Sequence, residues 1–310
     1  MNRLVIATRG SKLALAQAGW VAGRLMQISP GLEVELKIIK TTGDKIQDVA
    51  LAKVGGKGLF VKEIEAALQD EKADLAVHSL KDMPAELPAG LMLAAIPKRE
   101  DPRDVFIGRN GLKFDDLPAK ARLGTSSLRR QAQLLALKPS LEIIPLRGNV
   151  ETRLRKMNEE KLDGVVLAAA GLKRLGLGDQ GGEILPVEIM LPAVGQGALA
   201  LEARQDDITT RGLAEQMTDP DTLAAVTAER AFLARLQGGC QVPIAGFAWM
   251  EGGKVVLKAL VADLDGRRAV RGQGRADRQQ AAALGRQVAE EVLVKGGRAI
   301  LAELYGEAPA

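Results

Sequence analysis

The chain has very little cysteine and histidine, with one of each among its 310 residues. A single thiol can form no disulfide within the chain, and it cannot build a cysteine-rich metal site. One histidine adds too few nitrogen ligands for a transition-metal centre. We therefore expect no bound metal, and the absence of paired cysteines favours a reducing compartment.

Aromatic residues are also scarce, at 3% of the chain, and 43 basic residues against 39 acidic ones leave a net charge of only +4. Nonspecific nucleic-acid binding needs a basic surface and aromatic side chains that stack on bases. We therefore expect no nucleic-acid partner. A cationic site in this protein must come from the local placement of a few side chains.

Long apolar runs are absent, and none approaches the ~20 residues that a membrane-spanning helix needs. The N-terminal stretch MNRLVIATR does not have the form of a signal peptide. We expect a cytoplasmic protein that makes no membrane contact. Because no oligomerisation surface stands out, we expect a monomer.

Short apolar runs alternate with helical segments through most of the chain. Strand, turn and helix in repeated succession are typical of an α/β fold with mainly parallel sheets. The expected strands cover residues 4–7, 34–40, 74–78, 141–146, 164–168 and 198–202.

Two connectors rich in proline or glycine, residues 97–102 (PKREDP) and 191–197 (LPAVGQG), are candidate domain boundaries. Beyond Asp219-Pro220 we expect a helix over 221–236, short strands joined by Gly-Gly and Asp-Gly turns, and a final helix over 277–304. Such turns are typical of antiparallel hairpins. The predicted domains are residues 1–97 with 198–216 (α/β), residues 103–191 (α/β) and residues 220–310 (small, α+β).

The single cysteine, Cys240, lies in the segment LQGGCQVP at residues 236–243. Two glycines before it and a proline after it are typical of a loop tip, where the sulfur can meet another molecule. Free cysteine is also often buried as a small apolar side chain at a helix end. This segment alone leaves both interpretations open.

Cationic and hydroxyl side chains recur where a predicted strand ends and a helix begins. The ligand crevice of an open parallel sheet lies at that edge, where helix N-termini attract anions. Arginine binds carboxylates through two N–H groups, so the pattern predicts a polyanion site, although each cation taken alone would be a solvated surface charge. The cations are Arg9, Lys53, Lys57, Lys81, Arg129, Arg130, Arg147 and Arg153. The hydroxyl residues, which also fit simple helix caps, are Ser11, Ser126 and Ser127.

Asp82 is the one carboxylate in this otherwise cationic set, between Lys81 and Met83-Pro84. It either forms the turn before the proline or stabilises a developing cation and transfers protons. His78, at the end of an apolar strand, fits a structural role better than that of a base for Cys240.

Seven motifs, in order along the whole chain, resemble the porphobilinogen deaminase (hydroxymethylbilane synthase) family. They are ATRGS (7–11), KVGGKGLF (53–60), VHSLKDMP (77–84), GTSSLRR (124–130), LRGN (146–149), PAVGQG (192–197) and GGCQVP (238–243). The number and order of these motifs make the resemblance highly specific.

The resemblance implies a transferase of tetrapyrrole and haem biosynthesis. Such an enzyme joins four porphobilinogen molecules head to tail, with loss of ammonia, on a covalently attached dipyrromethane primer, and it releases hydroxymethylbilane by hydrolysis. The resemblance implies that Cys240 carries this cofactor through a thioether. It further implies two domains like those of type II periplasmic binding proteins, with the crossovers acting as hinges, and a third domain that bears the cysteine.

The resemblance also implies roles for individual residues. Those that would bind the cofactor are Lys81, Thr125, Ser127, Arg129 and Arg130. Those that would bind substrate or the growing chain are Arg9, Ser11, Gln17, Arg147, Arg153 and Arg174. Asp82 would stabilise the cationic azafulvene left by deamination and would shuttle protons. A lid over the cleft would include Lys53, Lys57 and Phe60.

Two rival functions use the same residues. A noncatalytic anion-binding protein with two lobes is usually exported, and it would need no cysteine on a loop. A thiol-dependent acyl transferase would use Cys240 and His78. Glu151 follows Asn149 near the basic start of a helix. We expect it to face outward, because an inward carboxylate would weaken carboxylate binding and count against a binding role for Arg153.

Overall fold

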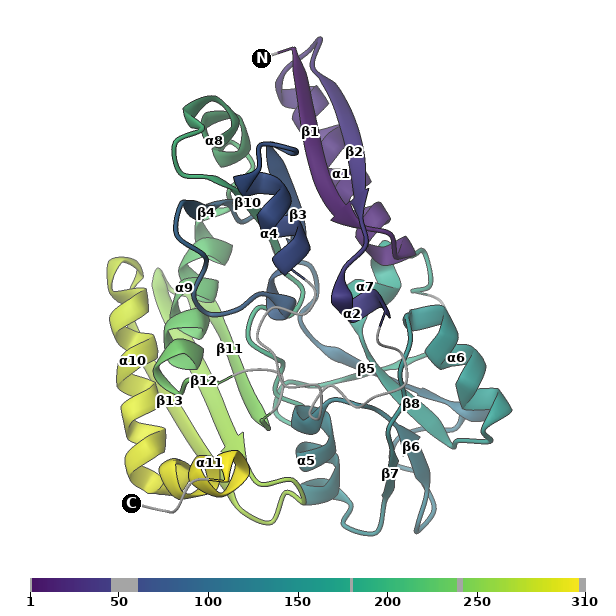
Figure 1. Ribbon diagram of the computed structural model, residues 1–310. Helices are drawn as coiled ribbons and strands as arrows, with labels where there is room; N and C mark the ends of the chain where they lie inside the picture. Colours follow the sequence, from purple (N-terminus) through teal and green to yellow (C-terminus); the bar gives the residue numbers. More distant parts are fainter. Residues whose placement is uncertain (1, 46–60, 179–180, 239–241, 307–310) are drawn as a thin grey trace.

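The computed structural model describes residues 2–45, 61–178, 181–238 and 242–306. Three sheets, each with its own helices, make up the molecule (Figure 1). The first sheet lies at the top of the view, the second at the lower right and the third at the lower left. No helix in the described ranges is both long and apolar enough to cross a membrane.

The first sheet has five strands in the order β2-β1-β3-β10-β4. Its strands are β1 (Arg3–Arg9), β2 (Glu33–Ile39), β3 (Leu75–Ser79), β4 (Leu91–Ala95) and β10 (Leu199–Arg204). Its helices are α1 (Lys12–Ile28), α2 (Thr42–Lys45), α4 (Lys62–Gln69), α8 (Ile208–Glu215) and the short 3-10 turn η1 (Leu80–Asp82). Fully buried apolar side chains, among them Leu4, Ile6 and Leu25, pack α1 against the sheet.

The second sheet also has five strands, in the order β7-β6-β8-β5-β9. Its strands are β5 (Asp104–Gly108), β6 (Arg122–Gly124), β7 (Glu142–Ile144), β8 (Gly164–Ala168) and β9 (Glu183–Leu185). Its helices are α5 (Leu128–Leu137), α6 (Val150–Glu159), α7 (Ala169–Arg174) and the 3-10 turn η2 (Arg109–Gly111).

The α/β prediction is confirmed, and both of these sheets are mixed. In the first, β1 runs parallel to β2 and β3, whereas β10 runs antiparallel to β3 and β4. In the second, β6 runs parallel to β7 and β8, whereas β5 runs antiparallel to β8 and β9. The reason is the path of the chain. A first crossover, residues 96–103, leads from β4 in the first sheet to β5 in the second, and a second crossover, residues 186–198, leads back from β9 to β10. β5 and β10 therefore each begin at the edge where the parallel strands end, with Leu199 opposite Ser79.

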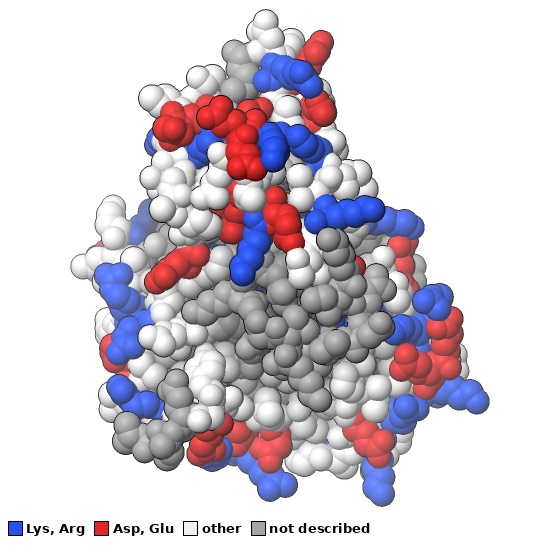
Figure 2. Space-filling view, in the orientation of Figure 1, with Lys and Arg blue, Asp and Glu red and all other residues white. Residues whose placement is uncertain are grey.

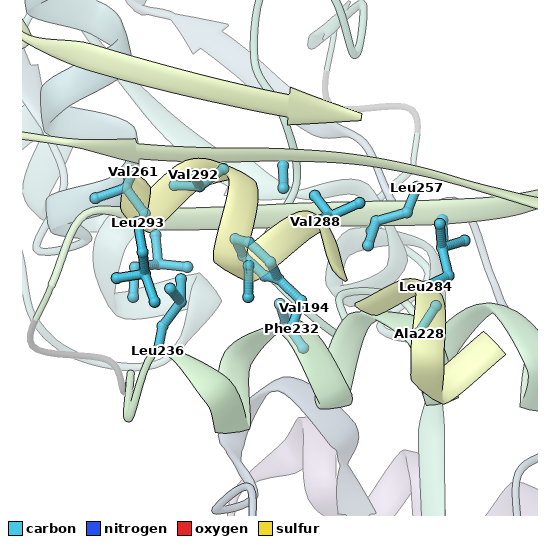
Figure 3. Close-up of a cluster of buried hydrophobic side chains, with 14 of the residues drawn as sticks. Val194, Ala228, Phe232, Leu236, Leu257, Val261, Leu284, Val288, Val292 and Leu293 are labelled. Carbon is cyan, nitrogen blue, oxygen red and sulfur yellow. The ribbon is translucent and has the colours of Figure 1, made fainter. Parts of the chain in front are cut away.

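The third sheet is an antiparallel set, β11-β12-β13, as the glycine-rich turns predict. Its elements are β11 (Ile244–Glu251), β12 (Lys254–Ala262), β13 (Ala269–Asp277), α9 (Pro220–Arg235), η3 (Arg278–Gln280), α10 (Ala281–Val292) and α11 (Arg298–Tyr305). Phe232 of α9, Leu257 of β12 and Val288 of α10 meet in its core (Figure 3).

The single final helix expected over 277–304 is wrong in one respect. A π-helical turn, Leu293–Gly297, interrupts it, and Gly296 inside this turn has φ of 111°. Only glycine adopts that backbone conformation without strain, so the Gly296-Gly297 pair ends one helix and lets α11 begin in a new direction.

One buried carboxylate fastens both crossovers to the third sheet. Glu229 of α9 is fully buried and accepts a hydrogen bond of 2.6 Å from Nη1 of Arg99, in the first crossover. It also accepts the backbone N–H of Gly195, from the second crossover, at 2.6 Å and that of Ala248, in β11, at 2.7 Å. The two crossovers and β11, which lie far apart in the sequence, are therefore joined by hydrogen bonds to one carboxylate.

We call Glu229 and its three partners the Glu229 hub. Removing one partner tests how much this hub contributes to stability. Arg99→Met leaves the Glu229 carboxylate buried without its cation, so we expect a loss of about 3–5 kcal/mol in the free energy of unfolding, measured with urea. The control is Arg155→Met, which removes an exposed ion pair with Glu159 on α6 and should change stability by about 0.5 kcal/mol or less. Equal losses in the two variants would contradict the assignment.

Candidate active site

A cavity of about 60 Å³ opens at the carboxyl ends of β1 and β3. This is the edge at which the sequence predicts a ligand site. Four of the predicted site residues line it, namely Arg9, Ser11, Gln17 and Asp82. The other described residues of its wall are Leu13, Ala14, Val61, Val77, His78 and Ser79.

Two polar side chains of the cavity are held in place by local hydrogen bonds. Ser11 caps α1 and accepts the backbone N–H of Ala14 at 3.2 Å. Gln17 is buried one turn further along α1, and its Nε2 donates to Ser79 Oγ at 2.9 Å. The amide of Gln17 is therefore fixed between α1 and the end of β3.

Arg9 already binds a carboxylate of its own chain. Its Nε donates to Asp44 Oδ1 at 3.1 Å, and its Nη2 donates to the same oxygen. Burial alone would raise the pKa of Asp44, but hydrogen bonds from Arg9 and Thr41 outweigh it and hold that pKa below its usual value. No local pattern in the sequence distinguishes Asp44, although it follows β2, the strand beside β1. Nε and Nη2 of Arg9 are therefore engaged with Asp44.

Asp104 organises the two arginines of α5. It is fully buried at the start of β5, with Nη1 of Arg129 at 2.7 Å and Nη2 of Arg130 at 2.7 Å. Gln196 of the second crossover adds an Nε2 donor at 3.0 Å. Burial alone would raise the pKa of Asp104, but the two guanidinium charges hold it well below its usual range. No local pattern in the sequence distinguishes Asp104 either.

Arg129 and Arg130 are 5% and 4% exposed, so their guanidinium groups are packed inside the protein and do not extend into solvent as free arms. Arg130 Nη1 donates to Val166 O, and Arg129 Nη1 donates to Leu191 O, both at 2.8 Å. In the described part of the chain, however, the buried Nε of Arg129 has no hydrogen-bond partner. A buried donor without a partner costs ~1–3 kcal/mol, so a bound carboxylate would stabilise this group.

Cations from both large sheets share one electrostatic field around Asp82. The pKa of Lys81 is lowered to about 8: burial is the largest cause, the charge of Asp82 opposes it, and the charges of Arg130 and Arg129 act in the same direction as burial. Burial likewise lowers the pKa of Arg153 to about 10; Arg130 and Arg147 act in the same direction, and Asp82 opposes them. The donor set thus carries excess positive charge, which fits a ligand with several carboxylates.

Other predicted residues are engaged with the backbone. Thr125 Oγ1 accepts the N–H of Ser127 at 3.2 Å, and Ser127 caps α5. Arg153 Nε donates to Gly148 O at 2.8 Å. Arg174 Nη2 donates to Gly197 O at 2.8 Å, so it contacts the second crossover. Burial lowers the pKa of Arg174.

Four predicted residues lie outside the part of the chain that the structure describes, namely Cys240, Lys53, Lys57 and Phe60. Glu151 faces outward, as expected, and pairs with Lys12 of α1 at 2.7 Å. Acidic and basic side chains intermingle over the face in Figure 2. The excess of positive charge is therefore a local property of the site.

Two family models match the chain. The porphobilinogen deaminase dipyromethane cofactor binding domain matches residues 4–212, and the porphobilinogen deaminase C-terminal domain matches residues 223–294. Porphobilinogen deaminase of Geobacter sulfurreducens is 55% identical, covering 98% of this chain and 96% of that one. The same enzyme of Brevibacillus brevis is 52% identical, covering 99% of each.

Solved structures similar to the chain include the unliganded open L-cystine solute receptor of Neisseria gonorrhoeae. It is 13% identical, with a TM-score of 0.37, and the match covers 69% of this chain and 85% of that one. A Salmonella typhimurium periplasmic binding protein with high arginine specificity is 12% identical, with a TM-score of 0.37, over 70% and 92% of the two chains.

The lowered pKa of Lys81 predicts a pH-dependent stability. Because that pKa falls from 10.5 in the unfolded chain to about 8 in the folded one, the folded state binds this proton more weakly. The penalty is complete below pH 8 and disappears as pH rises toward 10.5. In a Cys240→Ala background, Lys81→Met should therefore raise the free energy of unfolding by roughly 1–3 kcal/mol at pH 7, and less at pH 10.

The control for this experiment is Lys113→Met, which removes an exposed lysine. Its effect on the free energy of unfolding should be small and should not vary between pH 7 and pH 10 in the way that the Lys81→Met effect does. A Lys81→Met effect that stays constant over this range would contradict the assignment.

Proposed function

The chain belongs to the porphobilinogen deaminase family, and on that basis we propose that the reaction takes place in the cavity around Asp82. The protein is a transferase that joins four porphobilinogen molecules head to tail, with loss of ammonia, on a covalently attached dipyrromethane primer. It releases hydroxymethylbilane by hydrolysis. The observation that carries the placement is the set of cations from two sheets around one carboxylate, Asp82.

The dipyrromethane cofactor supplies a primer to which the first substrate is joined. We assign its thioether to Cys240 and its carboxylates to the residues of the α5 wall and the end of β3, namely Lys81, Thr125, Ser127, Arg129 and Arg130. Two observations support this assignment: the unsatisfied Nε of Arg129 and the like-charge environment of Lys81. Each charge-assisted hydrogen bond contributes ~1.5–3 kcal/mol, so a few such bonds hold a polycarboxylate firmly.

The incoming substrate and the growing chain also carry carboxylates. We assign their binding to Arg9, Ser11, Gln17, Arg147, Arg153 and Arg174. Their place in the cavity wall supports the assignment of Arg9, Ser11 and Gln17. Arg153 belongs to α6 of the second sheet, and its charge interacts with that of Asp82. Arg174 belongs to α7 and donates to Gly197 O of the second crossover.

Asp82 is assigned two tasks. Loss of ammonia leaves positive charge on the substrate, which a preplaced carboxylate stabilises. Formation of the carbon–carbon bond then requires removal of a proton from the pyrrole carbon, and a carboxylate at the cavity wall accepts it. Asp82 interacts electrostatically with the positive charges of Lys81 and Arg153. This polar environment supports the assignment.

We further propose the domain division 1–97 with 198–216, 103–191 and 220–310, with the two crossovers as hinges. The lid is assigned to Lys53, Lys57 and Phe60. We also propose a monomer, because no oligomerisation surface stands out in the sequence. A thioether to Cys240 needs a free thiol beforehand, which supports a reducing cytoplasm.

Intact mass separates this function from its rivals. The purified chain should carry a covalent dipyrrole adduct, and Cys240→Ala should have neither adduct nor turnover. A noncatalytic anion-binding protein, or an acyl transferase that uses Cys240 and His78, would carry no such adduct. An unmodified mass for an active wild-type chain would refute the proposal.

Asp82→Asn should keep the adduct and lose kcat by about 10²–10⁴-fold, because the amide neither accepts the proton nor compensates the cation. Turnover is measured by the formation of product, and retention of the cofactor by intact mass. The matched control is Asp115→Asn, which changes an exposed carboxylate and should leave kcat unaltered. A near-normal rate for Asp82→Asn would remove this residue from its assigned role.

A further inference from the structure

Three titratable side chains form a buried cluster beside the cavity. They are His78 of β3, Glu202 of β10 and Glu65 of α4, which are 5%, 0% and 5% exposed. His78 Nε2 lies 2.9 Å from Glu202 Oε2. None of the three has a role in the function proposed above. Burying such groups is costly, so their placement calls for an explanation.

The strand register fixes how His78 points. In the antiparallel pairing of β3 with β10, His78 lies opposite Ala200, so Glu202 is the diagonal neighbour on the same face of the sheet. His78 is also part of the cavity wall, together with Asp82. Among the described residues, only Glu202 forms a hydrogen bond with the imidazole, and it does so at Nε2. The other ring nitrogen, Nδ1, is thus left for the cavity.

The contact between His78 and Glu202 assigns the imidazole proton. A carboxylate oxygen accepts hydrogen bonds, so the Nε2–H of His78 donates to Glu202 Oε2, and Nδ1 of the imidazole then carries a lone pair. Glu65 lies in the same buried cluster, where burial, and then the charge of Glu202, raise its pKa. A carboxylate that orients an imidazole toward a reaction site is a common arrangement for a general base.

Other charged groups surround this cluster from each packed element. Arg230 of α9 and Lys62 of α4 interact with the glutamates, and Asp82 and Arg9 face the same cavity. His78 and Asp82 both line the cavity, which at about 60 Å³ has room for water. A proton can therefore pass from one wall to the other without direct contact of the two side chains.

We propose that His78, oriented by Glu202, is a second proton-accepting residue of this cavity. The inference rests on the function proposed above. When the carbon–carbon bond has formed, the pyrrole C–H bond breaks, its electron pair restores the aromatic ring, and the proton goes to Asp82. Nδ1 of His78 takes it from Asp82 and passes it to the ammonia that has left the substrate, which becomes ammonium. Asp82 is then ionised again for the next of the successive additions.

The single histidine makes the first test direct. Holoenzyme without a histidine tag, labelled with ¹⁵N in the imidazole ring, yields signals from His78 alone. At neutral pH we expect the tautomer protonated at Nε2, with Nδ1 bare. The opposite tautomer, protonated at Nδ1, would overturn the proposal, because Nδ1 would then have no lone pair for a proton.

Chemical rescue distinguishes a proton acceptor from a structural histidine. His78→Gln keeps a donor for Glu202 but cannot carry a proton, so kcat should fall at least tenfold while KM stays within about twofold and the adduct is retained. The rate of His78→Ala should then rise with the concentration of added imidazole. Glu202→Gln, a change at the positioning residue, should move the acid limb of the kcat–pH profile to lower pH, because the imidazolium loses its anion.

Glu65→Gln is the matched control, since it replaces a buried carboxyl of the same cluster that does not bond to the imidazole with an amide of the same shape. It should leave kcat, the pH profile and the ¹⁵N signals near their wild-type values. A His78→Gln holoenzyme that turns over within twofold of wild type would overturn this inference alone. A wild-type chain without adduct or turnover would instead defeat the proposed function.

Discussion

The site depends on one buried carboxylate between two guanidinium groups. Arg129 and Arg130 are adjacent in α5, and two cations side by side in a buried wall would repel each other strongly. Asp104 lies between them with no exposed surface and hydrogen bonds to both. Gln196 joins the same carboxylate from the second crossover. The wall thus keeps a net positive charge and a fixed geometry.

A second buried carboxylate, Glu229, likewise pairs with an arginine and joins separate segments, here at the third sheet. Arg99 bonds to it from the first crossover, and Arg99 Nε also donates to Gln196 O at 2.8 Å. Gln196 therefore connects the Glu229 hub to the Asp104 hub. Both crossovers, the wall of α5 and the third sheet, which carries the cysteine segment, are held in one continuous set of hydrogen bonds. Changes at one hub are expected to affect the other.

The electrostatic balance of the cavity follows from this framework. Anions of the chain neutralise the arginines that build the wall, while Lys81 and Arg153 retain positive charge whose burial lowers their pKa values. We propose that substrate carboxylates supply the missing negative charge. We assign the chemistry to Asp82, whose charge acts on these cations, and we infer that His78 returns it to its ionised form.

Local patterns predict much of this structure. Ser11, Ser127 and Asn149 cap α1, α5 and α6, and each is recognisable from the chain because a cap depends on residues three positions away. The strand ends that carry Arg9 and Asp82 follow from the alternation of apolar runs in the same way.

The carboxylates that organise the site were not predictable in this way. Asp44 meets a partner 35 positions distant, Asp104 meets partners 25 and 26 positions distant, and Glu229 meets one 130 positions distant. Nothing local distinguishes such an aspartate from a solvated one. The same limit applies to Arg129 and Arg130, whose spacing predicts a cationic site but not that both are buried against Asp104.

The most direct test of this account is the fraction of chain that carries the covalent dipyrrole in an Asp104→Asn variant, measured by intact mass on folded, purified protein. Asparagine keeps the size of the side chain but removes the charge that holds the two arginines together. We expect that fraction to fall to a small part of the wild-type value. An Asp104→Asn chain with a full complement of cofactor would contradict the claim that this carboxylate organises the site.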